Sequence, residues 1–276
     1  RDLPALLIAF SGNRIVVHCH GSDLESLLTK GWLSGIVKVV YSRCEVIVPC
    51  RKLEERIKDK VMKVHICENF FGDECLQTLD SSKNHSHLSI IWNSNIMSSK
   101  GFFDVVSAVN ELVCSGHRIE LLCYGKVLGD YEMSEGNVQR ELVKYNESDW
   151  FAYLGPIDHS SAVRALQNAD AVILPSRYTS EMQPLAIIEA MCASKRIIVS
   201  DTASLRATVG NYPADFVPIG NVAAIAECIE RLYTDKLSNP KEFFIGNRAA
   251  AALAKERFCT ARFDAEMTNI LVSEGI

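Results

Sequence analysis

The sequence lacks several features that define large classes of proteins. A membrane-spanning helix needs about 20 consecutive apolar residues, and no apolar run approaches that length; the run at residues 3–10 is far shorter. The chain has no secretory signal pattern. It has no excess of basic residues, because 29 Lys and Arg stand against 34 Asp and Glu, for a net charge of −5. We therefore expect no membrane-spanning helix within these residues and no global electrostatic attraction to nucleic acid.

Paired metal-binding or redox motifs are also missing. The chain has ten cysteines, but they are scattered and none forms a C-x-x-C pair. We therefore expect free thiols in a reducing compartment, which indicates a cytoplasmic protein. Two His-x-His pairs, at residues 18–20 and 85–87, have no second ligand cluster at a metal-binding spacing. The sequence therefore predicts no metal site.

The pattern that is present alternates short apolar runs with amphipathic segments. Such runs, unbroken by polar residues, are typical of parallel strands that are buried on both faces by helices. The expected fold class is α/β, with two doubly wound parallel sheets, although 276 residues do not exclude one large domain. The expected strands are residues 15–17, 46–49, 64–67, 88–92, 119–124, 153–154, 171–174 and 197–200. The expected helices are residues 24–40, 52–60, 102–115, 160–168, 184–193, 222–233 and 242–271.

A polar segment without periodicity, residues 73–87, separates two blocks of strands and predicts a linker. We therefore expect a Rossmann-like domain in residues 1–72 and a second in residues 73–255, which includes the linker. Residues 256–276 are expected to form a helix that crosses back to the first domain. Ligands bind beyond the carboxyl ends of strands in such sheets, which places the loops after Trp92, Tyr124, Leu154, Leu174 and Ser200 on the ligand side.

One stretch, residues 180–189 (SEMQPLAIIE), places two carboxylates around an apolar helix. Pro184 suits the first helical position, and the free amides of a helix start favour an anion such as phosphate. Glu189 then lies about 7 to 8 Å along the axis from Pro184, so Glu181 and Glu189 are able to bracket a phosphate group. In the alternative, Glu181 only favours the helix dipole, while Glu189 faces solvent or pairs with an arginine.

Residues 175–191, together with the IIVSD that follows at 197–201, resemble the E-x7-E region of retaining glycosyltransferases with the GT-B fold, specifically glycosyltransferase family 4. Residues 94–112 look like the donor loop of the same family. The resemblance implies transfer of a sugar from a nucleotide-diphosphate donor, UDP- or GDP-linked, to a carbohydrate or lipid-linked acceptor with retention of configuration. It implies no cofactor and no metal, and the usual setting is polysaccharide or glycan biosynthesis.

The resemblance also implies roles for particular residues. It makes Glu181, Lys100 and His20 the candidate catalytic residues, with Glu181 on the donor sugar and Lys100 on the leaving diphosphate. Glu189 would hold the ribose hydroxyls. The candidate donor-binding residues are Asn95, Lys100, Gly101, Tyr153, Leu154, Ile157, Ser176, Glu181, Met182, Gln183, Pro184, Leu185 and Glu189.

This sequence departs from the family pattern at several positions. Many members place an arginine five residues before the donor-loop lysine, where this chain has Asn95, so we expect Lys100 to bear more of the diphosphate contact or Arg177 to help. Ser194 stands where the family usually has a glycine, which predicts a turn built differently. The resemblance begins late in the family's N-terminal domain, so the first sheet is expected to be truncated.

Other functions stay open at this stage. A chain with an incomplete acceptor domain is alternatively a binding module for nucleotide-sugar, or one subunit of a glycosyltransferase complex. A different GT-B enzyme, such as a sugar-nucleotide epimerase, is less consistent with the E-x7-E region. Association with the inner face of a membrane, or with further copies of the chain, is left open. We expect no nucleic-acid partner.

Overall fold

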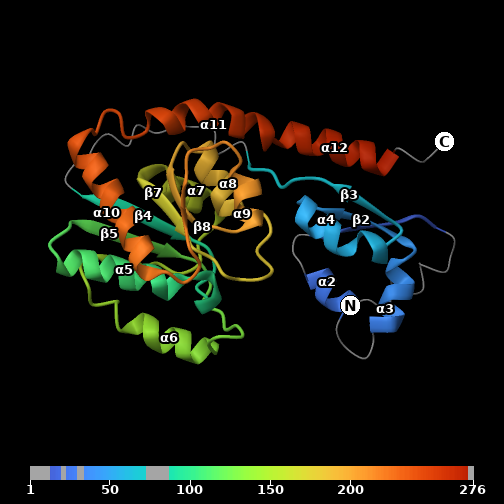
Figure 1. The fold of residues 1–276 in the computed structure, drawn as a ribbon, viewed down its shortest axis with the longest axis horizontal. Helices are drawn as coiled ribbons and strands as arrows, with labels where there is room; N and C mark the ends of the chain where they lie inside the picture. The colour runs from blue at the N-terminus through green and yellow to red at the C-terminus, as the bar shows by residue number, and fades with distance from the viewer. Residues whose placement is uncertain (1–12, 20–22, 30–33, 73–86, 273–276) are drawn as a thin grey trace. The chain divides into compact units, whose positions relative to one another are not determined.

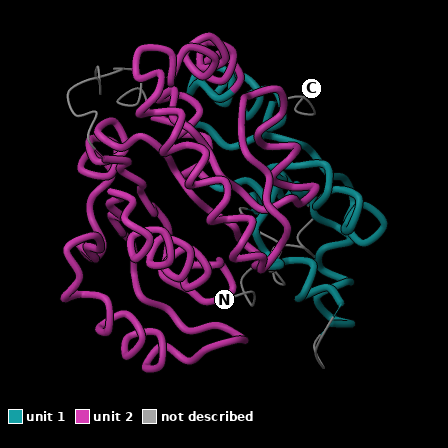
Figure 2. The backbone as a smooth tube through the Cα atoms, turned by 60° about the vertical axis from the view of Figure 1, so that its left-hand side comes forward, with its two compact units in different colours: residues 1–70, 179–184, 258–276 teal, residues 71–178, 185–257 magenta. Residues whose placement is uncertain are grey.

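The computed structural model describes residues 13–19, 23–29, 34–72 and 87–272, which form two compact units. Unit 1 contains the described residues of Arg1–Phe70, Thr179–Pro184 and Phe258–Ile276. Unit 2 contains those of Phe71–Tyr178 and Leu185–Arg257. The chain therefore passes between the units four times, and Figure 2 shows the two units in separate colours.

Unit 1 is built on three parallel strands in the order β1-β2-β3, within the residues that the structure describes. They are β1 (Ile15–His18), β2 (Cys44–Val48) and β3 (Lys63–Ile66), with helices α2 (Asp23–Thr29), α3 (Ser34–Tyr41), α4 (Arg51–Ile57) and the 3-10 helix η1 (Lys58–Lys60) in the connections. Every residue of β2 is buried, as expected for a central parallel strand. Its Val46 and Val48 pack in one apolar cluster with Leu28, Leu53 and Ile57.

The last helix of the chain, α12 (Thr260–Val272), belongs to unit 1. Ile270 packs in a small core with Ile47 and Cys67. The Arg14 guanidinium donates to the carbonyls of Ile270 and Leu271, both at 2.7 Å, and also pairs with the buried Glu45. This pairing, together with His65, lowers the pKa of Glu45 to about 2. Hydrogen bonds from the charged Arg14, together with apolar contacts of Ile270, therefore hold the C-terminal helix against the sheet of unit 1.

Unit 2 is built on six parallel strands in the order β6-β5-β4-β7-β8-β9. They are β4 (Leu88–Asn93), β5 (Ile119–Tyr124), β6 (Phe151–Tyr153), β7 (Ala171–Leu174), β8 (Arg196–Ser200) and β9 (Asp215–Val217). The register pairs Leu88 with Ile119 and Ile90 with Ala171, so β4 lies between β5 and β7. Strand β7 is buried along its whole length, which explains its unbroken apolar sequence.

Helices cover both faces of this sheet (Figure 1). Right-handed crossovers put α5 (Phe102–Cys114) and α6 (Glu135–Val143) on one face, and α7 (His159–Asn168), α8 (Leu185–Cys192) and α9 (Ala203–Val209) on the other. Helix α10 (Val222–Ser238) packs beside α5, and α11 (Ile245–Arg257) beside α8. The connections leave β4 toward β5 and leave β7 toward β8, so the strand order reverses between β4 and β7. In open α/β sheets this switch point is where ligands bind.

The structure corrects three expectations drawn from the pattern. The predicted helix over residues 242–271 is two helices, because α11 ends at Arg257 and the buried Phe258 starts the passage into unit 1. The predicted helix over residues 24–40 is also divided, into α2 and α3. The turn after α8 is not built differently from a glycine turn, because Ser194 itself adopts the left-handed conformation, with φ 61°. Lys195 N donates to Ala190 O and Ser194 N donates to Met191 O, as in a Schellman helix end.

Within the described ranges, none of the helices combines the length and the apolar character that crossing a lipid bilayer requires.

Candidate functional site

The carboxyl end of β4 contacts two of the predicted site residues of unit 2, Lys100 and Glu189. Asn93, the last residue of β4, donates through Nδ2 to Glu189 Oε2 at 3.4 Å. Its neighbour Ser94 accepts a hydrogen bond from Lys100 Nζ at its Oγ, at 2.9 Å. One strand end therefore contacts both the carboxylate from helix α8 and the ammonium from the 3-10 helix η3 (Ser98–Lys100). Both contacts lie beside the switch point between β4 and β7.

Glu189 is a buried carboxylate with only 6% of its surface exposed. Burial raises its pKa, and the imidazole of His159, whose Nδ1 lies 3.6 Å from Glu189 Oε1, lowers it in part. His159 opens helix α7, behind the N-cap Asp158, and half of its side chain is exposed. A buried carboxylate is costly unless it is paired, and long contacts to an amide and a half-exposed imidazole satisfy it only loosely. A carboxylate whose pKa is perturbed by burial and whose contacts are long is a candidate functional group.

Gly101, directly after Lys100, allows the donor loop to approach the end of β7. Its φ is 81°, which only glycine adopts without strain. A Cβ at this position would lie 2.5 Å from Pro175 O, which is closer than any real contact. The backbone nitrogen of Arg177 also donates to Ser99 O at 2.9 Å. The loops that follow β4 and β7 are therefore in direct backbone contact.

A second glycine brings the loop after β5 against the loop after β4. Gly125 has φ 137°, and a Cβ there would lie 2.0 Å from Ser94 O. Its nitrogen donates to Gly155 O at 3.1 Å, and its carbonyl accepts from the Tyr153 hydroxyl at 2.9 Å. Burial raises the pKa of this hydroxyl, so it stays a donor. The predicted Tyr153, at the end of β6, and Asn95, in the loop after β4, thus both lie beside Gly125. The loops after β4, β5, β6 and β7 all lie at the carboxyl end of the sheet.

Arg177, expected as a possible aid to Lys100, has its charge engaged elsewhere in unit 2. Its guanidinium forms ion pairs with Glu132 and Asp104. These carboxylates raise its pKa, the hydrogen bond to Glu132 contributing most. Two acidic partners on one guanidinium leave little net positive charge for a phosphate, so the arrangement does not favour Arg177 as a diphosphate ligand.

Four predicted donor residues, Glu181, Met182, Gln183 and Pro184, lie in the segment Thr179–Pro184, which groups with unit 1. Met182 is buried among Leu24, Leu28 and Val48. Gln183 is also buried: it accepts from the Asn69 nitrogen at 2.6 Å and donates to Glu68 Oε1 at 2.9 Å. Glu181 is half-buried. Their donor roles stay predictions.

The remaining predicted residues occupy varied environments. Ser176 is buried after β7, and its carbonyl accepts from the Ser200 hydroxyl. Leu154 and Leu185 are exposed, at 52% and 51%, and Ile157 and Pro184 are half-buried. The prediction for His20 falls outside the described residues.

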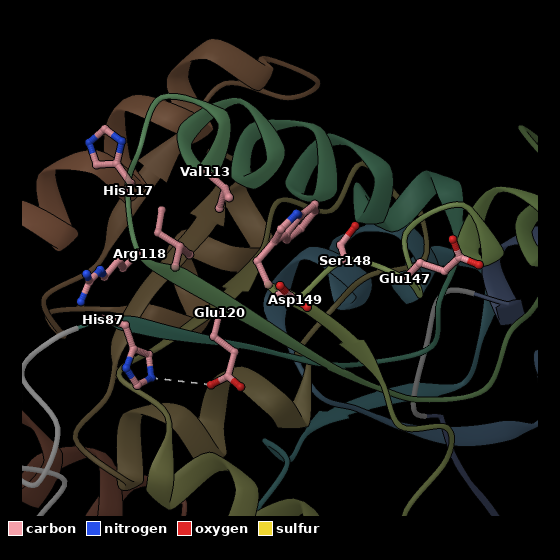
Figure 3. A pocket seen from close by; sticks show the side chains of 10 residues that line it. His87, Val113, His117, Arg118, Glu120, Glu147, Ser148 and Asp149 are labelled. Carbon is pink, nitrogen blue, oxygen red and sulfur yellow. Dashed lines mark ion pairs between the residues drawn. The ribbon is translucent and has the colours of Figure 1, made fainter.

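Two pockets in unit 2 lie at opposite ends of its sheet. One, of about 550 Å³, lies between α6 and the loops after β5 and β6, and Tyr153 and Lys126 are among its lining residues. The other, of about 690 Å³, lies at the amino ends of β4, β5 and β6 and is lined by His87, Glu120 and Asp149 among others (Figure 3). In it, His87 Nε2 lies 3.7 Å from Glu120 Oε2. None of the predicted site residues lines this larger pocket.

The structure adds three residues to the candidate site at the carboxyl end of β4 that the sequence did not predict: Asn93, Gly125 and His159. Asn93 and Gly125 each end or follow an apolar strand, a signal that was available in the sequence. His159 had no such signal, because only the fold brings the start of α7 to within 3.6 Å of Glu189. In the described portion of the chain, no group of three or more His, Cys, Asp or Glu residues is placed to hold a metal ion.

Solved structures define the class of this fold. A sucrose-phosphate synthase from Thermosynechococcus elongatus is 17% identical, with a TM-score of 0.76 over 97% of this chain and 69% of that one. HepE from Anabaena, in complex with UDP and glucose, is 14% identical, with a TM-score of 0.77 over 99% of this chain and 76% of that one. A glycosyltransferase from Rickettsia africae is 15% identical, with a TM-score of 0.72 over 98% and 73%. The fold is that of the GT-B glycosyltransferases.

A family model narrows this class. Residues 88–235 match the model of the glycosyl transferases group 1. The chain belongs to that family. The matched residues run from the start of β4 into α10, so they include Asn93, Lys100 and Glu189. Among curated protein sequences, none matches this chain significantly.

Proposed function

We propose that this protein transfers a sugar from a nucleoside-diphosphate sugar to a carbohydrate or lipid-linked acceptor, with retention of configuration at the anomeric carbon. The observation that carries the proposal is the end of β4, where adjacent residues contact Glu189 at 3.4 Å and Lys100 at 2.9 Å. A cation and a hydrogen-bond-accepting carboxylate at a switch point match the two chemical parts of such a donor, its diphosphate and its ribose.

Within the proposal, Lys100 stabilises the charge that develops on the diphosphate as it leaves. An ammonium is a compact point charge for phosphate, and a preorganised charge in a partly buried site acts more strongly than one in water. The first amides of α8 add partial positive charge at the same end of the sheet. Catalysis then consists of positioning and stabilisation of the leaving group. We propose that no metal or cofactor is needed.

Glu189 accepts hydrogen bonds from the ribose hydroxyls in this account. Its buried carboxylate has long contacts to Asn93 and His159, and such contacts often tighten only when a ligand binds. Glu181 remains the candidate for the donor sugar and His20 the candidate beside the reacting centre, both by family resemblance. The donor roles of the other predicted residues rest on the same resemblance.

The structural neighbours suggest which donor to test first. HepE was solved with UDP and with UDP-glucose, which supports a uridine diphosphate donor over other bases. The acceptor class follows only from the family resemblance, as do synthesis of a polysaccharide or glycan and a cytoplasmic location.

Turnover tests the proposal directly. The protein is incubated with UDP-glucose, and proton NMR follows the release of glucose and the anomer that forms first. Retention predicts that α-glucose appears before mutarotation mixes the anomers. Early β-glucose contradicts the retaining mechanism. Binding of UDP without turnover of UDP-glucose, GDP-mannose or ADP-glucose contradicts the transferase and favours a nucleotide-sugar-binding module.

A further inference from the structure

The segment that follows β5 places an acidic loop over the donor loop of unit 2. This acidic loop, residues 130–133, includes Asp130 and Glu132, and it contacts residues 98 and 99 of the donor loop. Asp130 Oδ2 accepts from the Ser99 nitrogen at 2.8 Å, while its Oδ1 accepts from the nitrogens of Glu132 and Met133 at 2.8 and 3.0 Å. Burial acts to raise the pKa of Asp130, but these donors outweigh it and hold the pKa below its usual value. Asp130 is therefore an ionised cap on the start of η3.

Glu132 ties the same donor loop to the loop after β7. Its carboxylate accepts two hydrogen bonds from the Arg177 guanidinium, from Nε to Oε1 at 2.8 Å and from Nη2 to Oε2 at 2.9 Å. The Ser98 hydroxyl donates to the same Oε2 at 2.9 Å. The pair is largely shielded from water, since the side chains are 23% and 25% exposed. A bidentate pair of this kind fixes geometry as well as charge.

Arg177 completes the arrangement from the β7 side. The remaining guanidinium nitrogen, Nη1, pairs with Asp104 in the first turn of α5. Its backbone nitrogen donates to Ser99 O at 2.9 Å, and the Tyr131 hydroxyl donates to its carbonyl at 3.4 Å. One arginine thus connects α5, the donor loop, the acidic loop and the end of β7.

We infer that Arg177, Glu132 and Asp130 form a clamp that positions Lys100, with Arg177 as a positioning residue rather than a ligand of the donor. The inference rests on the proposed function for the role of Lys100. The clamp contacts the two residues directly before Lys100. The Ser98 hydroxyl donates to Glu132, the Ser99 nitrogen donates to Asp130, and the Ser99 carbonyl accepts from the Arg177 nitrogen. Because a misplacement of about 1 Å costs on the order of 100-fold in rate, loss of the clamp slows turnover more than it weakens binding.

The charges around the clamp distinguish it from a phosphate site. Arg177 contributes one positive charge, and Glu132, Asp104 and Asp130 contribute three negative charges within hydrogen-bond range of the clamp residues. A diphosphate is repelled by that surplus, so the donor's attraction to this end of the sheet must come from Lys100 and the start of α8. Removing the positive charge of Arg177 should therefore change nucleotide affinity little.

The test compares Arg177→Lys and Glu132→Gln with Arg231→Lys, a matched control. Arg177→Lys keeps the positive charge but loses the two parallel hydrogen bonds to Glu132. Glu132→Gln keeps the size of the side chain but loses its negative charge. Arg231 pairs with Asp215 at 2.5 Å, at the amino end of β9 and away from the donor loop. Three readouts are taken: UDP affinity by calorimetry, turnover of UDP-glucose, and amide hydrogen exchange in residues 97–101. Thermal melting shows that each variant is folded.

The clamp predicts that both variants lose turnover by 10-fold or more, while UDP affinity stays within about 3-fold and exchange in residues 97–101 accelerates by 10-fold or more. The double variant should lose no more than the worse single variant, because both changes remove one interaction. Arg231→Lys should match the wild type. A 10-fold loss of UDP affinity with unchanged turnover would make Arg177 a donor ligand and overturn the inference. Unchanged exchange would also overturn it.

The two proposals fail in different ways. If wild-type protein binds neither UDP nor GDP, the proposed function fails, and the exchange measurement still decides whether the clamp holds the donor loop. If the wild type binds UDP and turns over UDP-glucose but the Arg177 and Glu132 variants behave as wild type, the proposed function is supported and the clamp is contradicted.

Discussion

Buried charged groups at the two ends of the unit 2 sheet differ in how closely their partners satisfy them. At the amino end, Lys236 Nζ donates to Asp170 Oδ2 at 2.5 Å and to His87 O at 2.7 Å, and Asp170 also accepts from the Ser89 nitrogen at 2.8 Å. At the carboxyl end, Glu189 is equally buried, but its contacts are 3.4 and 3.6 Å long. A tightly satisfied pair of this kind stabilises the fold, whereas the proposed function makes the loosely satisfied Glu189 a hydrogen-bond acceptor for the donor.

The largest effect is expected at the amino end. Lys236→Met leaves Asp170 as a buried, uncompensated charge and should destabilise the protein by about 3–5 kcal/mol. Chemical denaturation measures the change in the free energy of unfolding. The control is Lys241→Met, at an exposed position, whose free energy of unfolding should stay within about 0.5 kcal/mol of the wild-type value. A loss below about 1 kcal/mol would show that the pair at this end is not structural.

Gly101→Ala tests the backbone approach at the carboxyl end. The left-handed conformation costs an alanine about 1–2 kcal/mol, and the new Cβ would meet Pro175 O at 2.5 Å, so a total loss of about 2–4 kcal/mol is expected. UDP affinity should fall by about 10-fold or more at the same time, since this backbone clash displaces Lys100 further than loss of the clamp does. Gly136→Ala, in helix α6 with nothing within 4 Å of its Cβ, is the control and should be neutral or slightly stabilising. Normal affinity in folded Gly101→Ala would separate this loop from the donor.

Glu189→Gln should weaken UDP binding by about 10-fold, equivalent to about 1.4 kcal/mol, without lowering stability. Its folded-state pKa lies above the unfolded value because of burial, so ionisation of Glu189 penalises the folded state, and the penalty grows as pH rises through 4.5 and then through the folded pKa. The stability of the variant relative to the wild type should therefore increase from pH 4 to pH 7. Melting curves across that range measure it. A variant that is less stable at pH 7 would show that Glu189 is a structural charge like Asp170.

The smallest effect concerns a turn at the amino end of β8. Ser194 adopts φ 61°, which costs a residue other than glycine about 1 kcal/mol. Ser194→Gly should raise the free energy of unfolding by up to about 1 kcal/mol and leave UDP affinity unchanged. A loss of stability would mean that the serine side chain contributes more than its backbone strain costs.

Much of the fold follows from local pattern. Residues 171–174 were predicted as a strand with the observed bounds, because a buried parallel strand is an unbroken apolar run. The bounds of residues 119–124 were also predicted, although Glu120 interrupts the apolar residues there. Helix α6 was missed because its sequence is mostly polar, with Val138 and Leu142 as its buried residues. The break at Phe258 was missed because apolar spacing continues through it, and only the passage into unit 1 ends α11.

The site was predictable only where chemistry is local. Lys100 and Glu189 stand out by their positions after a strand and inside an apolar helix. The burial of Met182 beside Cys50, whose sulfurs lie 3.9 Å apart, depends on residues more than a hundred positions away, so no local pattern reveals it. The same holds for the engagement of Arg177 by Glu132 and Asp104.

Calorimetric titration of the protein with UDP tests the central claim most directly. The account predicts saturable binding by the wild type, a loss of about 10-fold or more in Lys100→Gln and in Glu189→Gln, and no change in Lys241→Gln. Equal UDP affinity in the wild type and in folded Lys100→Gln and Glu189→Gln would contradict the placement of the donor at the carboxyl end of β4.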